Sequence, residues 1–442
     1  MSSDPMTDAL LSAPTEFRVI GVQSYGHGGS IFLHSLLDGH PQILALPGAL
    51  GVQFYASWSI RIGFMPRETI GHESMKALIM DFFSMVWNPA DGYSLGLTEL
   101  GEKMDQVAAV DREQFSRAFD ILFARMAGEA GLPAADKIDH ANIHRYRTIC
   151  LKAVYLAYSY LLGHDLSLKK FLLYPAHGGP MLDIGALCTD FPDIHFVHMV
   201  REPVENLDSI QRRLLEMEHE TPSQPPIDIV WCVFNQAFCD WAPQAPVCGV
   251  PMYAIHPYPT AKPGRTVGVQ LEQLHSAPQE TLGKLCRWLG LDWNECLMQS
   301  TFAGKTWWNR PGWRRVTGFN RNMTTRPPKF GKFDYWRLKW IAAPIDIGLG
   351  YSGHRRDPLR EWTALALSLA LPFGLEFSTF LLRRYLALTG GRKALAIALT
   401  PPLFAWDYLR HRSAIIKGYF FNRAATTRYV PMLATVPDKE TS

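Results

Sequence analysis

The chain has 442 residues, of which 47% are hydrophobic and 19% charged, so it can bury a large core and is not a disordered protein. Its length exceeds one typical domain and predicts a main domain with an addition. The seven cysteines include no CxxC pair and no repeated spacing, so we expect reduced structural thiols and no zinc site. The net charge of +3 is uneven, because residues 351–430 hold 12 Lys and Arg against four Asp and Glu.

The first predicted elements are a strand, a loop and a helix. The segment before them has neither the basic region nor the long apolar region of a signal peptide, so we expect a cytoplasmic protein. Residues 17–22 favour a strand, and glycines follow. From about Ser30, apolar residues up to Leu37 recur with helical spacing, which predicts a helix.

The remainder of the first 330 residues alternates between predicted helices and strands. Helices are expected over 112–127, 148–162, 204–217 and 279–289, and strands over 194–200, 251–255 and 266–271. This alternation predicts an α/β fold over residues 1–330, with a mainly parallel sheet flanked by helices. Residues 331–442 are expected to form a helical, apolar and basic C-terminal extension.

The glycines between the first strand and the first helix indicate an anion site. Glycine lets backbone amides approach an anion, and the following helix adds free N–H groups and the positive end of its dipole. A triphosphate-binding loop would end in Gly-Lys-Ser/Thr, whereas His27 and Gly28 stand at those positions. A kinase or triphosphatase is therefore a poor interpretation, and a tight turn without a ligand remains the structural alternative.

The stretch GSIFLHSLLDGHPQI resembles the 5′-phosphosulfate loop of sulfotransferases, which commonly read S-G-T-T-x-L-x-x-L-L-x-x-H-P. Gly29 and Ser30 match the Gly-Thr pair, and the leucines and the His-Pro pair fall in register. Two positions depart from the family: Ile31 replaces the second threonine, and His27 replaces the basic residue before Ser-Gly.

A second stretch, FPDIHFVHMVREPVENLDSIQRR, resembles the family's 3′-phosphate motif, a strand that ends in R-D-P with a serine eight residues after the arginine. Arg201 and Ser209 have this spacing, with Glu202 in place of the aspartate. Arg201 would leave the sheet at the carboxyl end of its strand, where open α/β sheets bind ligands, and a guanidinium suits a phosphate dianion. Purely structural roles for both residues are the alternative.

Two later stretches extend the resemblance to about residues 17–310 and imply a P-loop-like sulfotransferase fold. RTVGVQLEQLHSAPQETLGKLCRWLGL is similar to a family strand and helix in which Glu272 would tie a loop near the donor. TFAGKTWWNRPGW is similar to the segment that often closes over the donor, and it contains Gly304 and Lys305.

The resemblance implies transfer of a sulfuryl group from 3′-phosphoadenosine 5′-phosphosulfate (PAPS) to an acceptor hydroxyl, without a metal. The residues that would bind this donor are Gly26, Gly28, Gly29, Ser30, Ile31, Arg201, Ser209, Gly304 and Lys305.

Three histidines are the candidate catalytic residues. His27 would stabilise charge at the bridging oxygen if it is protonated. The acceptor must lose a proton, which requires a general base. His177 lies where relatives have K-x-P-x-H, with Leu173 in place of their lysine. His40 is the other candidate base, although a histidine at such a His-Pro helix end more often has a structural role.

A second function remains open. A catalytically impaired sulfotransferase-like protein, which binds the nucleotide or a partner without transfer, would explain the replacements at positions 27 and 31. The retained Arg201–Ser209 pair argues against this alternative.

The C-terminal extension contains two apolar runs flanked by basic residues. Residues 362–382 carry one charge, Glu376, and one proline, Pro372, and are long enough to span a bilayer. Prolines at 401 and 402 interrupt the second run, 394–406. A spanning helix, a peripheral or re-entrant helix at anionic headgroups, and a helical extension packed on the core all fit.

Membrane contact would make a glycolipid or another membrane-surface carbohydrate the natural acceptor, at the inner face of a membrane. We expect no nucleic-acid partner, and the sequence leaves the oligomeric state open.

Overall fold

The computed structural model describes most of the chain. The described residues are 4–24, 28–48, 50–51, 54–65, 70–89, 97–133, 142–176, 184–220, 265–309, 315–320, 330–351, 356–374, 376, 431–435 and single positions between 405 and 420.

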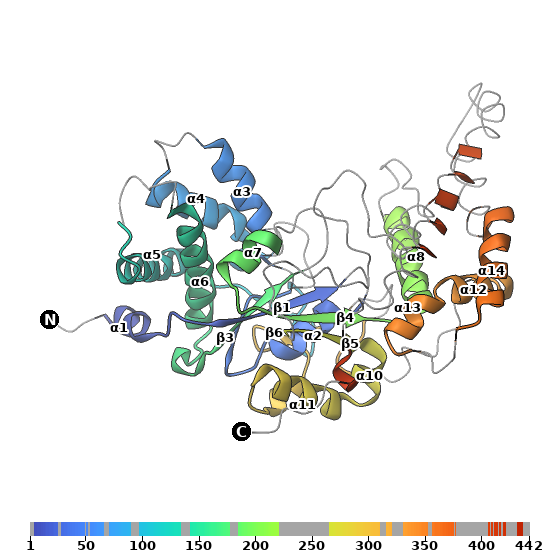
Figure 1. Ribbon diagram of the computed structural model, residues 1–442. Coiled ribbons are helices and arrows are strands. Elements are labelled where there is room, and N and C mark those ends of the chain that lie inside the picture. Colours follow the sequence, from blue (N-terminus) through green and yellow to red (C-terminus); the bar gives the residue numbers. More distant parts are fainter. Residues whose placement is uncertain are drawn as a thin grey trace.

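A parallel sheet lies at the centre of the molecule (Figure 1). Its five strands are β1 (Arg18–Ser24), β2 (Ile43–Ala45), β3 (Phe171–Pro175), β4 (His195–Val200) and β5 (Thr266–Gln270). Their order across the sheet is β2-β3-β1-β4-β5, and every neighbouring pair is parallel. The predicted α/β fold with a mainly parallel sheet is therefore confirmed. The strand predicted over 251–255 lies outside the described residues.

This strand order creates a switch point between β1 and β4. The connection after β1 leads to β2 on one side of the sheet, whereas the connection after β4 leads to β5 on the other side. Chains that leave neighbouring strands in opposite directions open a crevice at the carboxyl ends of those strands, where open α/β folds bind their ligands.

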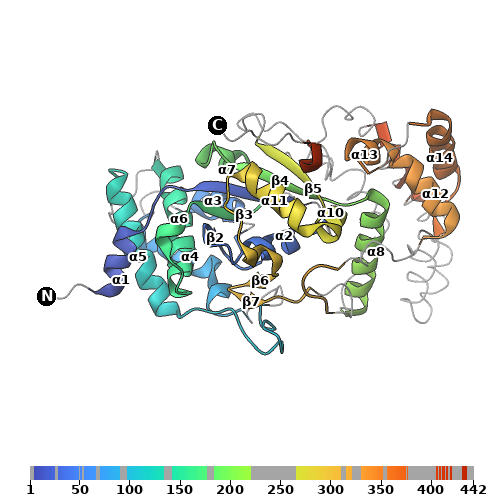
Figure 2. The ribbon, with the colours of Figure 1, turned by 90° about the horizontal axis from the view of Figure 1, so that it is seen from below.

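Helices cover both faces of the sheet (Figures 1 and 2). One face carries α2 (Ser30–Leu37), α10 (Leu271–Ser276) and α11 (Pro278–Leu289). The other carries α3 (Phe54–Phe64), α6 (Ile143–Leu161) and α7 (Ile184–Asp190). The remaining elements of the first 310 residues are α1 (Pro5–Ser12), α4 (His72–Phe82), α5 (Arg112–Glu129), α8 (Pro203–Glu220), short 3₁₀ turns over Ser84–Val86, Leu166–Leu168 and Glu295–Met298, and the hairpin of β6 (Thr301–Phe302) and β7 (Lys305–Thr306).

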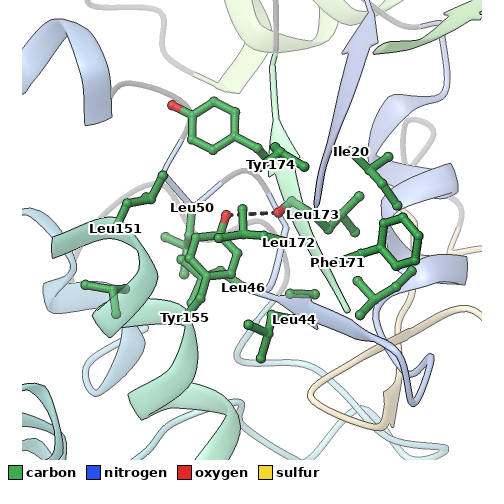
Figure 3. Close-up of a cluster of buried hydrophobic side chains, with 14 of the residues drawn as sticks. Ile20, Leu44, Leu46, Leu50, Leu151, Tyr155, Phe171, Leu172, Leu173 and Tyr174 are labelled. Atoms are coloured by element: carbon green, nitrogen blue, oxygen red, sulfur yellow. Dashed lines mark hydrogen bonds between the residues drawn. The ribbon is translucent and has the colours of Figure 1, made fainter. Parts of the chain in front are cut away.

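Strand β3 shows how the sheet core is assembled. All five of its residues are buried, so the strand is apolar throughout, as expected when helices cover both faces of a parallel sheet. Tyr155 of α6 donates a hydrogen bond from its hydroxyl to the carbonyl of Leu173, at 2.9 Å (Figure 3). The hydroxyl of Tyr174 donates to the carbonyl of Gly51 at 2.8 Å, so both of these buried tyrosines have polar partners.

An enclosed ion pair joins α3, α6 and α7 above the sheet. Two nitrogens of Arg147 donate to the two oxygens of Asp190, each at 2.8 Å, and the Asp190 side chain is fully buried. The hydroxyl of Tyr55 donates to the same carboxylate at 3.0 Å. The guanidinium also lies 4.8 Å from the centre of the Tyr55 ring. Removal of one partner would leave the other charge buried without compensation.

The substitution Asp190→Ala should therefore lower the free energy of unfolding by about 3–5 kcal/mol. Urea denaturation followed by circular dichroism measures this difference. The control is Asp81→Ala, which removes the exposed Arg61–Asp81 pair and should cost less than about 1 kcal/mol. Equal losses in the two variants would contradict the assigned role of the Arg147–Asp190 pair.

The C-terminal region is helical and packs beside α8. It contains α12 (Lys332–Ile341), α13 (Ala343–Gly348) and α14 (Pro358–Ala370), followed by a 3₁₀ turn over Leu433–Thr435. These helices share a second hydrophobic cluster with Val200, Val204 and Leu207 at the end of β4 and the start of α8. The amide of Gly268 in β5 donates to the carbonyl of Pro431 at 2.9 Å, so the chain returns to the sheet near its end. The division into domains at residue 330 stays a prediction.

The apolar run 362–382 is not one continuous helix, which argues against the spanning helix, one of the three alternatives left open by the sequence. Helix α14 ends at Ala370, and Leu371 adopts an extended conformation. Pro372 causes this end, because a residue before proline is disfavoured in the helical region. Within the part of the chain that the structure describes, no helix combines the length and apolarity needed to cross a membrane.

Candidate active site

The two anion-binding motifs leave the sheet at the same edge. Ser24, the last residue of β1, is in register with Met199, and Val200 ends β4 immediately before Arg201. Val200 is also in register with Gln270, the last residue of β5. The loop that enters α2 and the segment that enters α8 therefore begin at the carboxyl edge of adjacent strands, on either side of the switch point.

Helix α2 begins with a glycine that no other residue could replace without strain. Gly29 is the N-cap of α2 and has φ +92°, which favours glycine. A Cβ atom on Gly29 would also lie 2.5 Å from Cδ1 of Leu271. The helical hydrogen bonds begin with the amide of Leu33, which donates to the Gly29 carbonyl at 3.0 Å. The amides of the first turn, from Ser30 onward, have no partners within the helix and suit an anion.

Arg201 supplies a cation at this edge. Its half-buried side chain makes no hydrogen bond or ion pair with any residue in the described ranges. Its charge acts on two neighbours. Burial raises the pKa of Glu205, and the positive charge of Arg201 opposes that rise. Burial also lowers the pKa of His275, and Arg201 lowers it further, to about 4. The neutral His275 accepts a hydrogen bond at Nδ1 from the amide of Asn320, at 3.1 Å.

Ser209 lies on α8, eight residues after Arg201, and is partly exposed. Its hydroxyl has no hydrogen bond to any residue that the structure describes. Asp208, the preceding residue, is instead paired with Arg212 one turn later. An arginine without a partner and a serine without a partner on the same short segment are suited to bind an anion from outside the chain.

Glu202 fixes the backbone beside Arg201. One carboxylate oxygen accepts a hydrogen bond from the amide of Glu205 at 2.6 Å, which caps α8. The amide of Glu202 donates to Glu272 at 3.0 Å, and the Tyr351 hydroxyl donates to the other oxygen of Glu272 at 2.7 Å. The expected role of Glu272 in tying a loop near the donor site agrees with these contacts.

Lys339 of α12 joins this segment to the C-terminal helices. Its ammonium lies 2.7 Å from a carboxylate oxygen of Glu202 and 2.6 Å from one of Asp346. Burial alone would lower the pKa of Lys339, but the two carboxylates outweigh burial and raise it above its usual value. Glu202, Glu272, Asp346 and Lys339 are called the carboxylate–lysine cluster below.

In the cluster, Lys339 contacts the carboxylates of Glu202 and Asp346, and Glu272 is joined to them through the Glu202 amide. Asp346 is almost fully buried, and burial together with the charge of Glu202 raises its pKa from 3.8 to about 7, against the opposing effect of Lys339. A proton on Asp346 relieves repulsion among the carboxylates, so the protonation state of the cluster changes near neutral pH.

His40 lies at the opposite end of α2 from Gly29. Its Nδ1 accepts a hydrogen bond from the amide of Gln42 at 3.2 Å, so Nε2 carries the proton and donates to the Asp292 carbonyl at 2.9 Å. Both ring nitrogens are therefore engaged with backbone in a buried site. This geometry gives no support to His40 as the general base.

Gly304 and Lys305 are not brought to the start of α2. Burial raises the pKa of Asp38, at the C-terminal end of α2, to about 7, although hydrogen bonds from the Gly304 and Ala303 backbone lower it. The ammonium of Lys305 donates to the carbonyl of Val107 at 2.6 Å. Donor binding by this turn stays a prediction that its position does not favour.

The remaining predicted residues divide into two groups. Gly28, Gly29, Ser30 and Ile31 lie together at the start of α2. Gly26, His27 and His177 lie outside the described residues. Within the described ranges, no three His, Cys, Asp or Glu side chains are grouped to hold a metal ion.

Lys339, Asp346 and Tyr351 are the residues near Arg201 that the sequence did not reveal. They lie more than 130 residues after Glu202, in the segment expected to be an extension, and no motif marks them. Hydrogen bonds between residues so far apart in the sequence can be identified only once the positions of the helices in the fold are known.

The raised pKa of Asp346 leads to a prediction about stability and pH. Because the folded state binds this proton more tightly than the unfolded chain, the contribution of Asp346 to stability is full below about pH 4 and is lost as the pH rises to about 7. Over that range, the free energy of unfolding of the wild type should fall relative to Asp346→Asn, on the order of 2 kcal/mol.

Denaturation curves at a series of pH values measure this difference. Asp193→Asn, which alters an exposed pair with Arg265, is the control and should follow the wild-type pH dependence. If Asp346→Asn also followed the wild type, the assigned proton on Asp346 would be wrong.

One family model matches part of the chain. Residues 179–295 match a family model described as the sulfotransferase family, and this range includes Arg201 and Ser209. A search of curated proteins returns no match.

Solved structures with a similar arrangement include the sulfotransferase domain from the curacin biosynthetic pathway. That domain has 13% identity and a TM-score of 0.32, with 80% of this chain and 98% of that chain covered. Sulfotransferase STF9 from Mycobacterium avium also has 13% identity and a TM-score of 0.32, with 66% and 68% covered. Likenesses this distant add no argument of their own. The family match covers residues 179–295, so the chain is similar to the sulfotransferase family over that part of its length.

Proposed function

We propose that this protein transfers a sulfuryl group from PAPS to a hydroxyl acceptor. The observation that carries the proposal is the meeting of two anion-binding segments at the switch point. Helix α2 follows Gly29 with its N-terminal end at the carboxyl edge of the sheet, and the segment after β4 presents Arg201 and Ser209, whose side chains have no partner among the residues that the structure describes. Two separate anion sites suit a nucleotide that carries phosphate groups at both its 3′ and 5′ positions.

The donor fits the residues at hand. A Cβ atom at position 29 would clash with Leu271, so glycine is needed to hold the backbone in this conformation at the start of α2. The α2 amides and the positive end of the helix dipole would stabilise the 5′-phosphate. Arg201 would bind the 3′-phosphate through charge-assisted hydrogen bonds, and Ser209 would donate one more.

When bound, the donor supplies an activated sulfuryl group. The acceptor oxygen forms a bond to sulfur while the bond from sulfur to the bridging oxygen breaks, and the bridging oxygen leaves with the 5′-phosphate. The α2 amides would take up the charge that develops on this leaving group, and His27, if protonated, would add to them. A base must accept the acceptor's proton, and His177 is the candidate for this role.

We place the acceptor at a membrane surface, as a glycolipid or another membrane carbohydrate, and the protein on the cytoplasmic side. The support for this part of the proposal is the basic and apolar composition of residues 351–430.

A second candidate function is nucleotide or partner binding without transfer. His27 and Ile31 at positions where the family has a basic residue and threonine favour it. Incubation with PAPS labelled in the sulfuryl group and a membrane lipid extract distinguishes the two. Labelled lipid supports transfer, whereas nucleotide binding with no labelled product supports the second candidate.

Arg201→Ala should weaken binding of 3′-phosphoadenosine 5′-phosphate by roughly 10- to 100-fold, because a charge-assisted contact to the 3′-phosphate contributes about 1.5–3 kcal/mol. Isothermal titration calorimetry of the full chain measures the dissociation constant. Adenosine 5′-phosphate serves as a second ligand, and its affinity should be almost equal in the wild type and in the variant, because it lacks the 3′-phosphate.

Arg265→Ala is the matched control for this experiment. Arg265 comes directly before β5, at the opposite edge of the sheet, and pairs with Asp193. The variant should bind both nucleotides as the wild type does. Equal nucleotide affinity in Arg201→Ala and the wild type would exclude Arg201 from the donor site.

A further inference from the structure

The C-terminal helices leave an apolar surface uncovered. On α14, the exposed residues Leu359, Trp362, Ala366 and Ala370 recur every three to four positions and so form one stripe. The opposite stripe, which includes Ala364 and Leu365, is buried in the second hydrophobic cluster. Helix α14 is therefore apolar on both sides: one side is buried in the cluster, and the large side chains on the other side remain exposed.

A second stripe comes from the described positions between 405 and 420. All of the exposed residues among them are apolar: Ala405, Trp406, Leu409, Ile416 and Phe420. The large side chains in the two stripes are 37% to 77% exposed. The Trp362 and Phe420 ring centres lie 5.9 Å apart, so the two stripes meet. Leu359, Trp362, Trp406, Leu409, Ile416 and Phe420 are called the apolar face below.

Two of the acidic groups near this face, Glu361 and Glu376, are turned inward. Glu361 is buried and accepts two hydrogen bonds from Arg356, at 3.1 and 2.7 Å, and one from the Tyr419 hydroxyl at 3.1 Å. Glu376 is buried between His411, at 2.8 Å, and Arg412. Neither carboxylate contributes negative charge to the surface, because each is neutralised inside the fold.

The sequence of the region carries an excess of basic residues, although Arg356, Arg360 and Arg412, the arginines described there, are each paired with a carboxylate. Residues 351–430 hold 12 Lys and Arg against four Asp and Glu, and two of those four carboxylates are the buried Glu361 and Glu376. Arg360 beside the apolar face is exposed. Exposed tryptophan, phenylalanine and leucine within a basic region have the composition of surfaces that enter the headgroup zone of an anionic bilayer.

We infer that the apolar face binds the surface of an anionic lipid bilayer. The side chains of this face would enter the boundary between headgroups and acyl chains, and the surrounding basic residues would attract anionic headgroups. The interaction is peripheral, since α14 has 13 residues, fewer than the roughly 20 that a spanning helix needs. This inference concerns lipid and does not depend on sulfuryl transfer.

Sedimentation of the full chain with vesicles tests the inference. One set of vesicles contains phosphatidylcholine alone, and the other contains phosphatidylcholine and phosphatidylglycerol. The wild type should sediment with the anionic vesicles, and added salt should reduce the bound fraction. The double variant Trp406→Ser/Leu409→Ser removes two large apolar groups from exposed positions, so the fold should persist, and its partition coefficient should fall by about tenfold or more.

Trp293→Ser is the matched control, because Trp293 is an exposed tryptophan after α11. This variant should sediment as the wild type does. Equal partitioning of the double variant and the wild type, or a wild type that binds neither kind of vesicle, would overturn the inference. Sedimentation velocity without vesicles tests whether a second copy of the chain, rather than lipid, covers the apolar face. A wild-type dimer that dissociates in the double variant would also overturn the inference. Calorimetric titration of the same samples with 3′-phosphoadenosine 5′-phosphate measures nucleotide binding separately. A failure of lipid binding can therefore be told apart from a failure of the proposed donor site.

Discussion

The parallel pairing of β1 with β4 is the constraint on which the candidate active site depends. Parallel strands end at the same edge, so Ser24 and Val200, which end β1 and β4, lie at one edge of the sheet although they are 176 positions apart. The order β2-β3-β1-β4-β5 then sends the two following connections in opposite directions and opens the crevice between them. The sheet therefore determines where an anion can bind, and the two following segments supply its contacts.

The C-terminal helices have a structural role in this site. Lys339 and Tyr351 hold the carboxylates of Glu202 and Glu272, and the amide of Glu202 binds Glu272. The Arg201 backbone is thus supported from the sheet on one side and from the C-terminal helices on the other. The second hydrophobic cluster reinforces this connection, because Val200, Val204 and Leu207 pack with residues from α12 to α14. Through these contacts, a surface on α14 is physically continuous with the donor site.

The sequence predicted the elements that carry strong local signals. Strand β1, the start of α2 at Ser30, β4, α8 and α11 lie within one or two residues of their expected N-terminal bounds. Gly290 ends α11 with φ +76°, as its position after the apolar pattern indicated. Strands β2 and β3 were not predicted. Residues 43–45 are too few for a pattern, and the fully buried 171–175 show no alternation that separates a strand from a buried helix.

The site was predictable only where a motif marks it. Arg201 and the glycines before α2 carry such motifs, and the structure places them at one edge of the sheet. The carboxylate–lysine cluster depends on pairing between distant segments, which composition and spacing do not encode. Lys305 is a residue for which the motif match is weak. Its ammonium binds the Val107 carbonyl rather than the start of α2. The strong motifs thus lie together at one edge of the sheet, whereas the position of Lys305 does not favour its predicted role, and all of these donor contacts stay predictions.

A crystal structure of the full chain with 3′-phosphoadenosine 5′-phosphate would test the central claim most directly. The account predicts density for the 5′-phosphate at the amides that begin α2, and for the 3′-phosphate at the Arg201 guanidinium and the Ser209 hydroxyl. Density for the nucleotide elsewhere, with Arg201 unchanged and the start of α2 empty, would contradict the claim that the β1–β4 switch point is the donor site.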